Sequence, residues 1–506
     1  MASMDAGTPD APGALKLHRD DSVAVTLRAL AAGQEITVDG RAVTVREDIP
    51  KGHKLALRAI RMGEPIVRYG WPIGAASADI EAGSHVHVHN VTTRLTPDTA
   101  LTYAPNAAAI APGSRPLDGQ FMGYRRANGR VGIRNEIWVI ATVGCVTRTA
   151  QRIADTASKT LAGKVDGVHA ITHPFGCSQL GDDLAHTRAI LAALAGHPNA
   201  GGVLIVGLGC ESNQIAKLLG AAPHLDTTRI RAFAAQAAGD ELEEGLRLVD
   251  ELADLAALDE RTPCPLSDLV IGVKCGGSDG LSGLSANPLT GRMSERVAGA
   301  GGTAILTEIP EIFGAEHLLL DRAVSRDVFD AGAALVARFK RYFARHGEPV
   351  HENPSPGNIA GGITTLEEKS LGAVQKAGTA QLTSVLDYGQ QAMAPGLALL
   401  EAPGNDAVSS TALAAAGAQL ILFTTGRGTP LGFPVPTLKI ASNSDLAARK
   451  SHWIDFDAGT VLAGESPQTA ADRLFALILE TANGKPARNE INGEREIAIW
   501  KSGVTL

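Results

Sequence analysis

The stretch Ile137-Trp-Val-Ile-Ala-Thr-Val143, followed by Gly144-Cys145 and the segment Thr147–Lys164, decides the fold of this 506-residue chain. An uncharged run of this length predicts a strand buried on both faces, and the segment after it predicts a helix. The same order recurs three times downstream, in Val168–Thr172 with Asp182–Gly196, Val203–Leu208 with Ser212–Leu219, and Ile230–Phe233 with Glu241–Leu258. Alternating strands and helices predict a parallel sheet with helices on both faces.

A second block with the same pattern begins near Leu266. Its predicted strands are Leu269–Lys274, Thr303–Thr307, Leu397–Glu401, Gln419–Phe423 and Thr437–Ala441. Its predicted helices are Ser325–His346, Thr364–Ala377 and Gln468–Ala482. We therefore predict two α/β domains with mainly parallel sheets, over residues 119–262 and 263–506.

Residues 20–93 differ, because they contain short strand patterns and no helical period. Ser22–Leu30, Glu35–Val38 and Ala42–Arg46 are typical of strands, and Asp39-Gly40 predicts a hairpin turn. A loose repeat, Ile49-Pro-Lys-Gly-His, Ile60-Arg-Met-Gly-Glu and Ile80-Glu-Ala-Gly-Ser, predicts further turn-and-strand units. This segment is predicted to be a small β domain. Residues 1–19 are expected to form a disordered tail and residues 94–118 a linker.

Composition narrows the class of protein. Lys+Arg 46 against Asp+Glu 54 gives a net charge of −8 without like-charge blocks, which argues against nucleic-acid or membrane partners. Five cysteines are too few for a disulfide scaffold, and the start of the chain shows no secretory signal, so we expect a cytoplasmic location. With 56 glycines and 4% aromatic residues, the chain suits binding of a small polar ligand. We expect a soluble enzyme that forms a homo-oligomer.

The run Ser84-His-Val-His-Val-His-Asn90 is the first candidate site. On one strand, His85, His87 and His89 would share a face, with neighbouring imidazoles about 6–7 Å apart. Two of them can reach one divalent metal ion, which leaves the third to contact substrate or to support a ligand. The alternative is a solvated edge strand that is rich in histidine.

Four cysteines form the second candidate. Cys145, Cys177, Cys210 and Cys275 each follow a predicted strand. If those strands are parallel, the thiols lie at the carboxyl edge, where open α/β sheets bind ligands. That placement favours a soft-metal or iron–sulfur site, and the alternative is structural cysteines that fit crowded strand ends.

Polar, glycine-rich turns supply candidate substrate ligands. Lys274-Cys-Gly-Gly-Ser-Asp-Gly280 presents Lys274 and Asp279, and Thr424–Pro430 presents Arg427. The stretch Gly123–Glu136 holds four arginines, typical of a loop that binds an anionic, hydroxylated substrate. The alternative is an interface loop that pairs with acidic residues. No nucleotide-binding glycine pattern is found.

These strings, together with Gly52-His-Lys54, Arg68-Tyr-Gly70, His173–Cys177 and Gly207–Glu211, resemble the altronate/galactarate dehydratase family over nearly the whole chain. The resemblance implies that the small β domain is a SAF (β-clip) module. The histidine run resembles the altronate-type branch. A related sulfolactate sulfo-lyase keeps the SAF module as a separate chain, which implies that the module completes the active site.

The resemblance also implies a hydro-lyase reaction of hexuronate catabolism: D-altronate loses water to give 2-dehydro-3-deoxy-D-gluconate, with Fe²⁺ or Mn²⁺ as cofactor. A divalent metal would stabilise the enediolate formed when a base removes the C2 proton, and an acid would protonate the departing C3 hydroxyl. The alternatives are dehydration of galactarate or another aldarate, sulfo-lyase activity on sulfolactate, and a regulatory protein that binds a sugar acid.

Residue chemistry gives the expected roles. We expect His85 and His87 on the metal, His53 or Lys274 as base, and Tyr69 or His89 as acid. The expected substrate ligands are Arg125, Arg126, Asn128, Arg134, Asn135, Asp279 and Arg427. Cys145, Cys177, Cys210 and Cys275 are further candidate metal ligands, and an iron–sulfur cluster is the alternative to a single ion.

Overall fold

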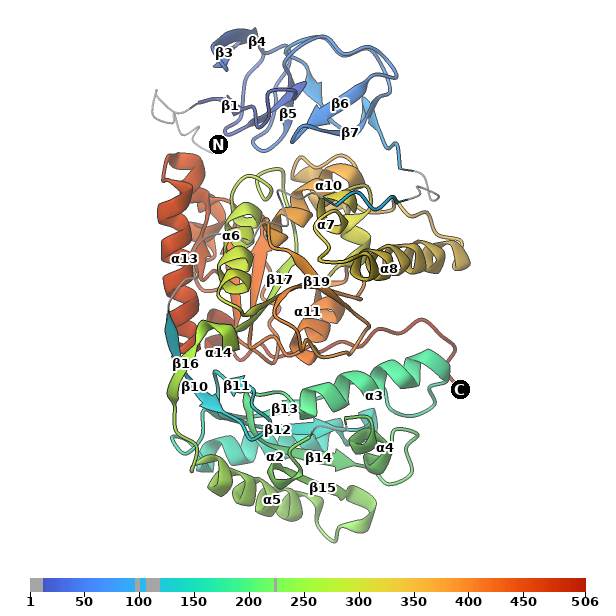
Figure 1. Ribbon diagram of the computed structural model, residues 1–506, viewed down its shortest axis with the longest axis vertical. Helices are drawn as coiled ribbons and strands as arrows, with labels where there is room; N and C mark the ends of the chain where they lie inside the picture. Colours follow the sequence, from blue (N-terminus) through green and yellow to red (C-terminus); the bar gives the residue numbers. More distant parts are fainter. Residues whose placement is uncertain (1–11, 96–100, 106–118, 223–224) are drawn as a thin grey trace, which may run out of the picture.

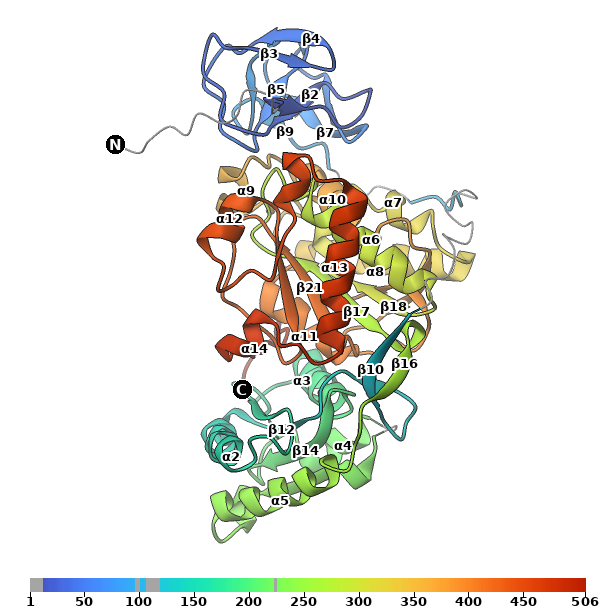
Figure 2. The ribbon, with the colours of Figure 1, turned by 90° about the vertical axis from the view of Figure 1, so that its left-hand side faces the viewer.

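Three domains follow one another along the long axis of the molecule (Figures 1 and 2). The computed structural model describes residues 12–95, 101–105, 119–222 and 225–506. The largest, C-terminal domain lies between the N-terminal β domain and the second domain in both views. The chain first forms the N-terminal β domain at one end of the molecule and then the second domain at the opposite end. It then returns to form the C-terminal domain between them.

The N-terminal domain consists of short antiparallel strands, as predicted. Its sheets have the orders β1-β2-β5-β8, β3-β4 and β6-β7-β9. The strands are β1 Ala14–Leu15, β2 Val23–Thr26, β3 Glu35–Val38, β4 Arg41–Thr44, β5 Lys54–Ala56, β6 Pro65–Arg68, β7 Trp71–Ala76, β8 His85–Val86 and β9 Val91–Thr92. The predicted hairpin turn is present, since Asp39 and Gly40 both have positive φ angles, of 48° and 74°.

The repeat is visible in the structure as four turns. Ile49 pairs with Leu30 and Ile60 pairs with Ile80 through isolated bridges. A glycine stands three positions after each of these four residues, and its φ angle lies between +81° and +87°, as in Gly52 and Gly83. Glycine is needed there because other side chains rarely adopt this conformation.

The expected boundaries of this domain need one correction. Residues 12–19 are not a disordered tail, because β1 pairs with β2 and Ala14 is buried in a cluster with Leu30 and Ile36. Of the expected linker, residues 96–100 and 106–118 lie outside the described residues. Between them, Tyr103 packs against Phe329 of the C-terminal domain, with ring centroids 5.0 Å apart.

The second domain confirms the predicted parallel sheet. Its strand order is β13-β12-β14-β15, and every pair is parallel. Helices α2 and α5 pack on one face, and α3 packs on the other, against the C-terminal domain. The elements are β12 Glu136–Ala141, α2 Thr147–Thr160, β13 Gly167–Ile171, α3 Gly181–Ala195, β14 Ala200–Gly207, α4 Ile215–Gly220, β15 Ile230–Ala234 and α5 Glu241–Ala256.

The C-terminal domain holds a parallel seven-stranded sheet of order β19-β20-β18-β17-β21-β22-β23. The strands are β17 Val270–Cys275, β18 Thr303–Leu306, β19 Leu382–Leu386, β20 Gly396–Leu400, β21 Leu420–Thr425, β22 Thr437–Ala441 and β23 Phe456–Asp457. The helices are α6 Ala286–Gly299, α7 His317–Leu320, α8 Arg326–Arg345, α9 Pro356–Ala360, α10 Leu366–Ala373, α11 Asp406–Ala415, α12 Ser444–Arg449, α13 Pro467–Ala482 and α14 Arg488–Asn492. The α/β class with mainly parallel sheets is thus confirmed.

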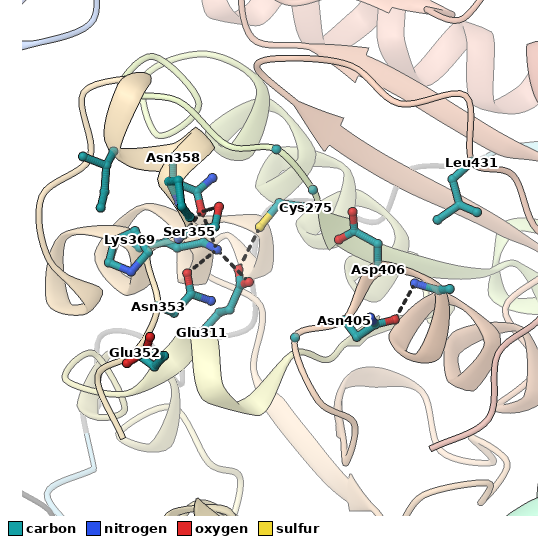
Figure 3. Close-up of a pocket in the computed structure, with 17 residues that line it drawn as sticks. Cys275, Glu311, Glu352, Asn353, Ser355, Asn358, Lys369, Asn405, Asp406 and Leu431 are labelled. Atoms are coloured by element: carbon teal, nitrogen blue, oxygen red, sulfur yellow. Dashed lines mark hydrogen bonds and ion pairs between the residues drawn. The ribbon is translucent and has the colours of Figure 1, made fainter. Parts of the chain in front are cut away.

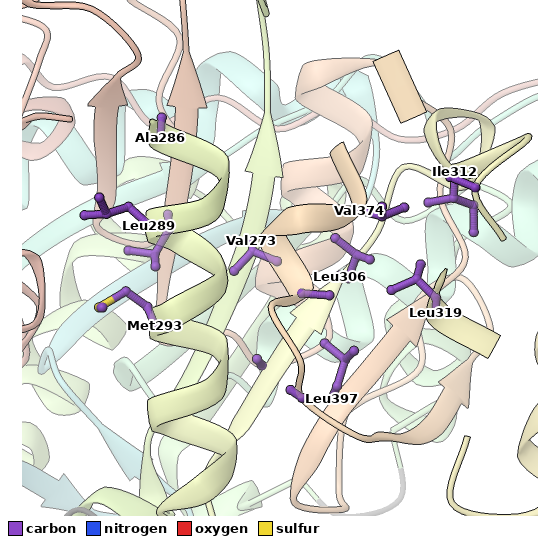
Figure 4. Packing of buried hydrophobic residues seen from close by; sticks show 14 of the residues in the cluster. Val273, Ala286, Leu289, Met293, Leu306, Ile312, Leu319, Val374 and Leu397 are labelled. Carbon is purple, nitrogen blue, oxygen red and sulfur yellow. The ribbon is translucent and has the colours of Figure 1, made fainter. Parts of the chain in front are cut away.

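The core of this domain fixes the strand ends that face the N-terminal domain. Leu289 and Met293 of α6 pack over Val273 of β17 and Leu306 of β18 (Figure 4). Each side chain is at most 2% exposed, so each contributes about 1.5–3 kcal/mol by burial. The central strands, and hence the residues that follow them, are held in place by this packing.

A small antiparallel sheet joins the two α/β domains. Strand β10 (Gln120–Arg125) pairs with β16 (Thr262–Pro265) and with β11 (Val131–Gly132). Among the residues that the structure describes, no helix combines the length and the apolar character that a membrane crossing needs.

Candidate metal and substrate site

Three imidazoles of the N-terminal domain converge where this domain docks on the C-terminal domain. His53 Nδ1 lies 3.0 Å from His85 Nε2, and the rings of His85 and His87 stack with centroids 5.2 Å apart. One ring nitrogen from each of the three residues falls within 4.8 Å of the others. His53 is the member that the strand pattern did not place here.

The geometry of the histidine run differs from the predicted strand. Strand β8 ends at Val86, and the chain then turns, because the Asn90 side chain accepts from the His87 N–H and donates to the His85 carbonyl. The turn keeps His87 beside His85 and leaves His89 exposed, with its ring centroid 5.5 Å from that of His85. His89 therefore lies at the edge of the cluster.

Three imidazoles form a donor set that fits a divalent transition-metal ion. His87 Nδ1 is buried and has no hydrogen-bond partner, which is costly unless another group binds it. His53 Nε2 lies 3.4 Å from the Ala360 carbonyl, so a proton on Nε2 leaves the Nδ1 lone pair directed at His85. A carbonyl that fixes the tautomer of a histidine is a common support of metal ligands.

All three imidazoles are held neutral. Burial lowers the pKa of His85 to about 3 and that of His87 to about 4, and it also lowers the pKa of His53. The neighbouring imidazoles add to this effect at His85. Neutral imidazole is the form that binds metal ions, so the cluster is ready to bind at neutral pH.

A buried ionic triad docks the two domains beside this cluster. The Glu368 carboxylate of α10 accepts from Lys54 Nζ at 2.9 Å and from Arg68 Nη1. Lys54 also donates to the Gly362 carbonyl and Arg68 to the Gly280 carbonyl, both in the C-terminal domain. Burial would raise the pKa of Glu368, but Lys54 and Arg68 outweigh it and lower the pKa to about 2. The carboxylate is therefore ionised and binds both cations.

A second charged cluster lies at the end of β17. Glu308 Oε1 and Oε2 accept from Lys274 at 2.7 Å and Lys376 at 3.0 Å. Lys376 also lies 2.8 Å from Cys275 Sγ, and Lys369 lies 2.9 Å from Glu311. Cys275, Glu308 and Glu311 offer three ligand atoms within 4.8 Å of one another, but the lysines already balance the carboxylates. This arrangement favours an internal ion-pair network over a metal site.

The ionisation of Glu308 should make the stability of the protein depend on pH in the acid range. Burial raises its pKa, but Lys274 and Lys376 lower it to about 2 overall. A carboxyl with a lower pKa in the folded state stabilises the fold above about pH 4.5, and this contribution is lost as the pH falls toward 2. We expect the free energy of unfolding, measured in urea, to change by about 2 kcal/mol less between pH 3 and pH 7 in Glu308→Gln than in the parent protein. Equal dependence would contradict this.

The ion-pair network forms one wall of a polar cavity of about 850 Å³ (Figure 3). Lys369 projects from α10 toward Glu311, and it donates to Asn353 and Asn358 at 3.0 and 3.2 Å. Asn405 and Asp406, at the start of α11, line the opposite side. The volume is in the range of small-molecule sites, and the lining of amides, an ammonium and a carboxylate suits a hydroxylated acid.

One segment connects this cavity to the histidine cluster. Ile359 of α9 lines the cavity, and the next residue, Ala360, accepts the contact from His53. Gly52 packs against the same segment, since a Cβ on Gly52 would lie 3.4 Å from the Gly361 carbonyl oxygen. The α9 segment is therefore shared between the cavity and the docking face of the imidazoles.

Lys274 does not have the surroundings of a base. Its ammonium donates to the Cys275 carbonyl, Glu308 and Asp406 at 2.7–2.9 Å. Burial opposes the charge, but Asp406 and Glu308 outweigh it and raise the pKa of Lys274 above its usual value. The side chain is thus a fixed cation that positions two carboxylates.

The other expected groups of this region are spread around the site. The Tyr69 hydroxyl packs against Gly283 and Gly372, and burial raises its pKa to about 12. Asp279 accepts from Ser282 and Ser442 within a turn network. Arg427 is exposed and lies 3.4 Å from the Gly357 carbonyl, beside the cavity. Of these, Arg427 is placed to meet a ligand.

The arginine stretch is not part of this site, which corrects the expectation for Arg125, Arg126, Asn128, Arg134 and Asn135. These residues lie on or between strands β10, β11 and β12, which stand at the junction of the C-terminal and second domains, far from the N-terminal domain (Figure 1). Each has a local partner: Arg125 pairs with Asp268, Arg126 with Asp259 and Asn135, Arg134 with Glu490, and Asn128 with the Arg130 N–H. The alternative, an interface loop paired with acidic residues, describes them.

Replacing Arg125 should therefore leave catalysis intact. Its ion pair with Asp268 is half exposed, so Arg125→Gln is expected to cost no more than about 1 kcal/mol of stability. We expect kcat/KM to change by less than about two-fold, since no substrate contact is lost. Steady-state kinetics and thermal melting measure both quantities. A large rise in KM would restore Arg125 to the substrate site.

The four cysteines also divide between two places. Cys275 ends β17 of the C-terminal sheet and is buried, with its pKa raised to about 12 by burial. Cys145, Cys177 and Cys210 are exposed at the sheet of the second domain. The expectation of one shared edge is wrong because the strands belong to two separate sheets.

Several residues of the site were not predicted. They are charged or amide side chains within otherwise ordinary segments: Glu308, Glu311, Asn353, Asn358, Glu368, Lys369, Lys376, Asn405 and Asp406. The one local signal is Glu367-Glu368-Lys369, three consecutive charged residues on a helix in which every residue except Lys369 is buried. Buried charges of this kind require partners, and the partners come from distant segments.

Comparison with known proteins agrees with the three-domain division. Residues 12–94 match the family model "Altronate/galactarate dehydratase SAF domain", and residues 123–257 match "D-galactarate dehydratase/Altronate hydrolase, second domain". Residues 266–505 match "D-galactarate/Altronate dehydratase, C-terminal". Each structural domain therefore has its counterpart in this family.

Curated relatives match over nearly their whole length. The chain is 49% identical to the altronate dehydratase of Escherichia coli (strain K12) and 46% identical to that of Bacillus subtilis (strain 168). Both alignments cover 97% of this chain and 99% of the relative. The galactarate dehydratase (L-threo-forming) of Escherichia coli (strain K12) is 34% identical, over 93% of each chain. With three matching domains in the same order, the chain belongs to the altronate/galactarate dehydratase family.

Proposed function

We propose that this protein is a metal-dependent hydro-lyase that dehydrates D-altronate to 2-dehydro-3-deoxy-D-gluconate. The observation that carries the proposal is the convergence of His53, His85 and His87 at the docking face of the N-terminal domain. Two relatives named altronate dehydratases, at 46–49% identity over nearly full length, support altronate as the substrate. The galactarate enzyme is a more distant relative.

His53, His85 and His87 would hold the ion, which we propose to be Fe²⁺ or Mn²⁺. Such an ion supplies Lewis-acid stabilisation of negative charge on a hydroxy acid. The Lys369 ammonium, with Asn353 and Asn358, can donate hydrogen bonds to the carboxylate and hydroxyls of a sugar acid.

Asp406 is a carboxylate of the cavity lining that can take part in proton transfer. Its side chain is 37% exposed and lines the cavity, whereas Glu308 is buried between lysines. Lys274 holds one Asp406 oxygen at 2.7 Å, which fixes the carboxylate in place. A positioned carboxylate of this kind can accept a proton from a bound hydroxy acid.

We also propose that the protein is cytoplasmic and homo-oligomeric. All five cysteines are free thiols, as expected in a reducing compartment.

A coupled assay for 2-keto-3-deoxy acids tests the function. Anaerobically purified protein is treated with a chelator, reloaded with Fe²⁺ or Mn²⁺, and given altronate, galactarate or sulfolactate. We expect product from altronate with either ion and loss of activity after chelation. Faster turnover of galactarate, release of sulfite from sulfolactate, or full activity in chelator would contradict the proposal.

A further inference from the structure

Three exposed cysteines gather at the carboxyl edge of the second domain. Cys145 follows β12, Cys177 follows β13 and Cys210 follows β14, and these are neighbouring parallel strands with β12 in the middle. Cysteine is among the residue types most often buried, so three exposed thiols at one edge need a reason. The altronate site proposed above lies at the other end of the molecule and does not use them.

Backbone contacts hold the three cysteine loops against one another. The Gly144 N–H donates to the Phe175 carbonyl at 2.8 Å, which joins the Cys145 and Cys177 loops. The Asn213 N–H donates to the Gly176 carbonyl at 2.9 Å, which joins the Cys177 and Cys210 loops. Asn213 Nδ2 donates to the Thr142 carbonyl at 3.2 Å and closes the set.

The loops are also packed too closely for larger residues. A Cβ on Gly176 would lie 2.2 Å from the Thr142 carbonyl oxygen, and one on Gly144 would lie 2.9 Å from that of Pro174. The Glu211 carboxylate binds the Thr142 hydroxyl at 2.6 Å and the Gly209 N–H at 2.6 Å. A buried carboxylate thus fixes the Cys210 loop to the end of β12.

Each thiol has neighbours that favour a sulfur ligand with negative charge. The Ser212 N–H donates to Cys177, which lowers the pKa of that thiol. Gln236 Nε2 lies 3.6 Å from Cys210 Sγ. Cys145 lies in the 3-10 turn Gly144–Val146 that leads into α2, whose N-terminus attracts negative charge. Donors directed at cysteine sulfur are typical of cluster ligands.

The spacing excludes a single ion held by the present geometry. Thiolates that share one tetrahedral ion at about 2.3 Å lie about 3.8 Å apart. In the described part of the chain, the groups with ligand atoms within 4.8 Å do not include these cysteines. Thiols at the ends of three adjacent strands, about 4.8 Å apart strand to strand, match a larger inorganic core.

We propose that Cys145, Cys177 and Cys210 bind an iron–sulfur cluster of the 4Fe–4S type. Three thiolates occupy three irons and leave the fourth iron open to water or to a small hydroxylated anion. Equal amounts of ferrous and ferric iron with sulfide supply the core without a net electron transfer, and the three thiols release their protons on binding.

Anaerobic reconstitution of the full-length protein with ferrous iron, ferric iron and sulfide tests the site. We expect about four irons and four acid-labile sulfides per chain beyond any ion at the histidines, with a broad visible absorption band. Cys145→Ala, Cys177→Ala and Cys210→Ala should each lose at least half of the labile sulfide, and the triple variant should lose all of it. Because these side chains are exposed, melting temperatures should stay near that of the parent.

Two controls separate this site from the proposed function. Cys264→Ala removes a buried cysteine on β16, and it should keep the full sulfide content. His85→Ala should also keep the labile sulfide, even where it loses the ion at the N-terminal domain. Reconstituted protein without labile sulfide, or a triple variant that keeps it, would overturn the proposal, as would binding of zinc alone with sulfide excluded.

Discussion

Replacing His85 by alanine should lower kcat/KM for altronate by at least about 1,000-fold and remove most of the ion bound at the N-terminal domain. A metal ion that stabilises developing charge supplies several kcal/mol, and each 1.36 kcal/mol is a factor of ten in rate. His85 contacts both other members of the cluster, with its Nε2 3.0 Å from His53 and its ring stacked on His87. Metal analysis and steady-state kinetics on the same sample measure both effects.

His18→Ala is the matched control, since His18 is an exposed histidine of the same domain outside the cluster. It should keep both activity and metal content. His89→Ala should keep most of the metal, because His89 lies outside the group of three, and a loss of kcat alone would assign it a role in proton transfer. A fully active His85→Ala variant would remove the histidine cluster from the mechanism.

Replacing Glu368 by glutamine is expected to destabilise the protein by at least about 3–5 kcal/mol. The change leaves Lys54 and Arg68 buried without their shared carboxylate, and uncompensated buried charges are among the costliest defects. Because both cations belong to the N-terminal domain and Glu368 to the C-terminal one, we also expect the two domains to separate more readily. Urea unfolding and limited proteolysis across residues 94–118 measure these effects.

Asp445→Asn is the control within the same interface. The Lys51–Asp445 pair joins the same two domains at 2.6 Å, but both side chains are exposed. Its loss should cost less than about 1 kcal/mol. Replacing Lys54, Arg68 and Glu368 together by methionine, methionine and leucine should recover part of the stability, because no buried charge remains. Equal effects of Glu368→Gln and Asp445→Asn would show that burial does not set the cost.

Local patterns in the sequence predicted most of the elements. Buried strands such as β12 and β21 are uncharged runs bounded by turn residues, and both properties can be read within a few residues. The elements that were missed include strands β10, β16 and β19 and helices α6 and α11. Strand β10 contains Gly123 and ends at Arg125, with Arg126 next in the sequence, and it pairs only with the short strands β11 and β16. The pattern there is that of a loop, and pairing with β16 makes it a strand.

The histidine run was found for a partly wrong reason. His85 and His87 do lie together, but the cause is a turn held by Asn90 and not a continuous strand. The third member, His53, is the residue directly before β5. The separation of 32 residues between His53 and His85 has no local signature. Antiparallel pairing of β5 with β8 is what brings the two segments together.

Strand and helix periods, turn glycines and the clustering of histidines are properties of neighbouring residues, so the chain's order alone settled the α/β class and pointed to His85 and His87. Which buried charges meet is a different kind of question. Glu368 reaches Lys54 and Arg68 across about 300 positions of sequence, and Arg134 turns to Glu490 instead of a substrate. A buried charge is stable only with a partner, and the packing of whole domains selects that partner.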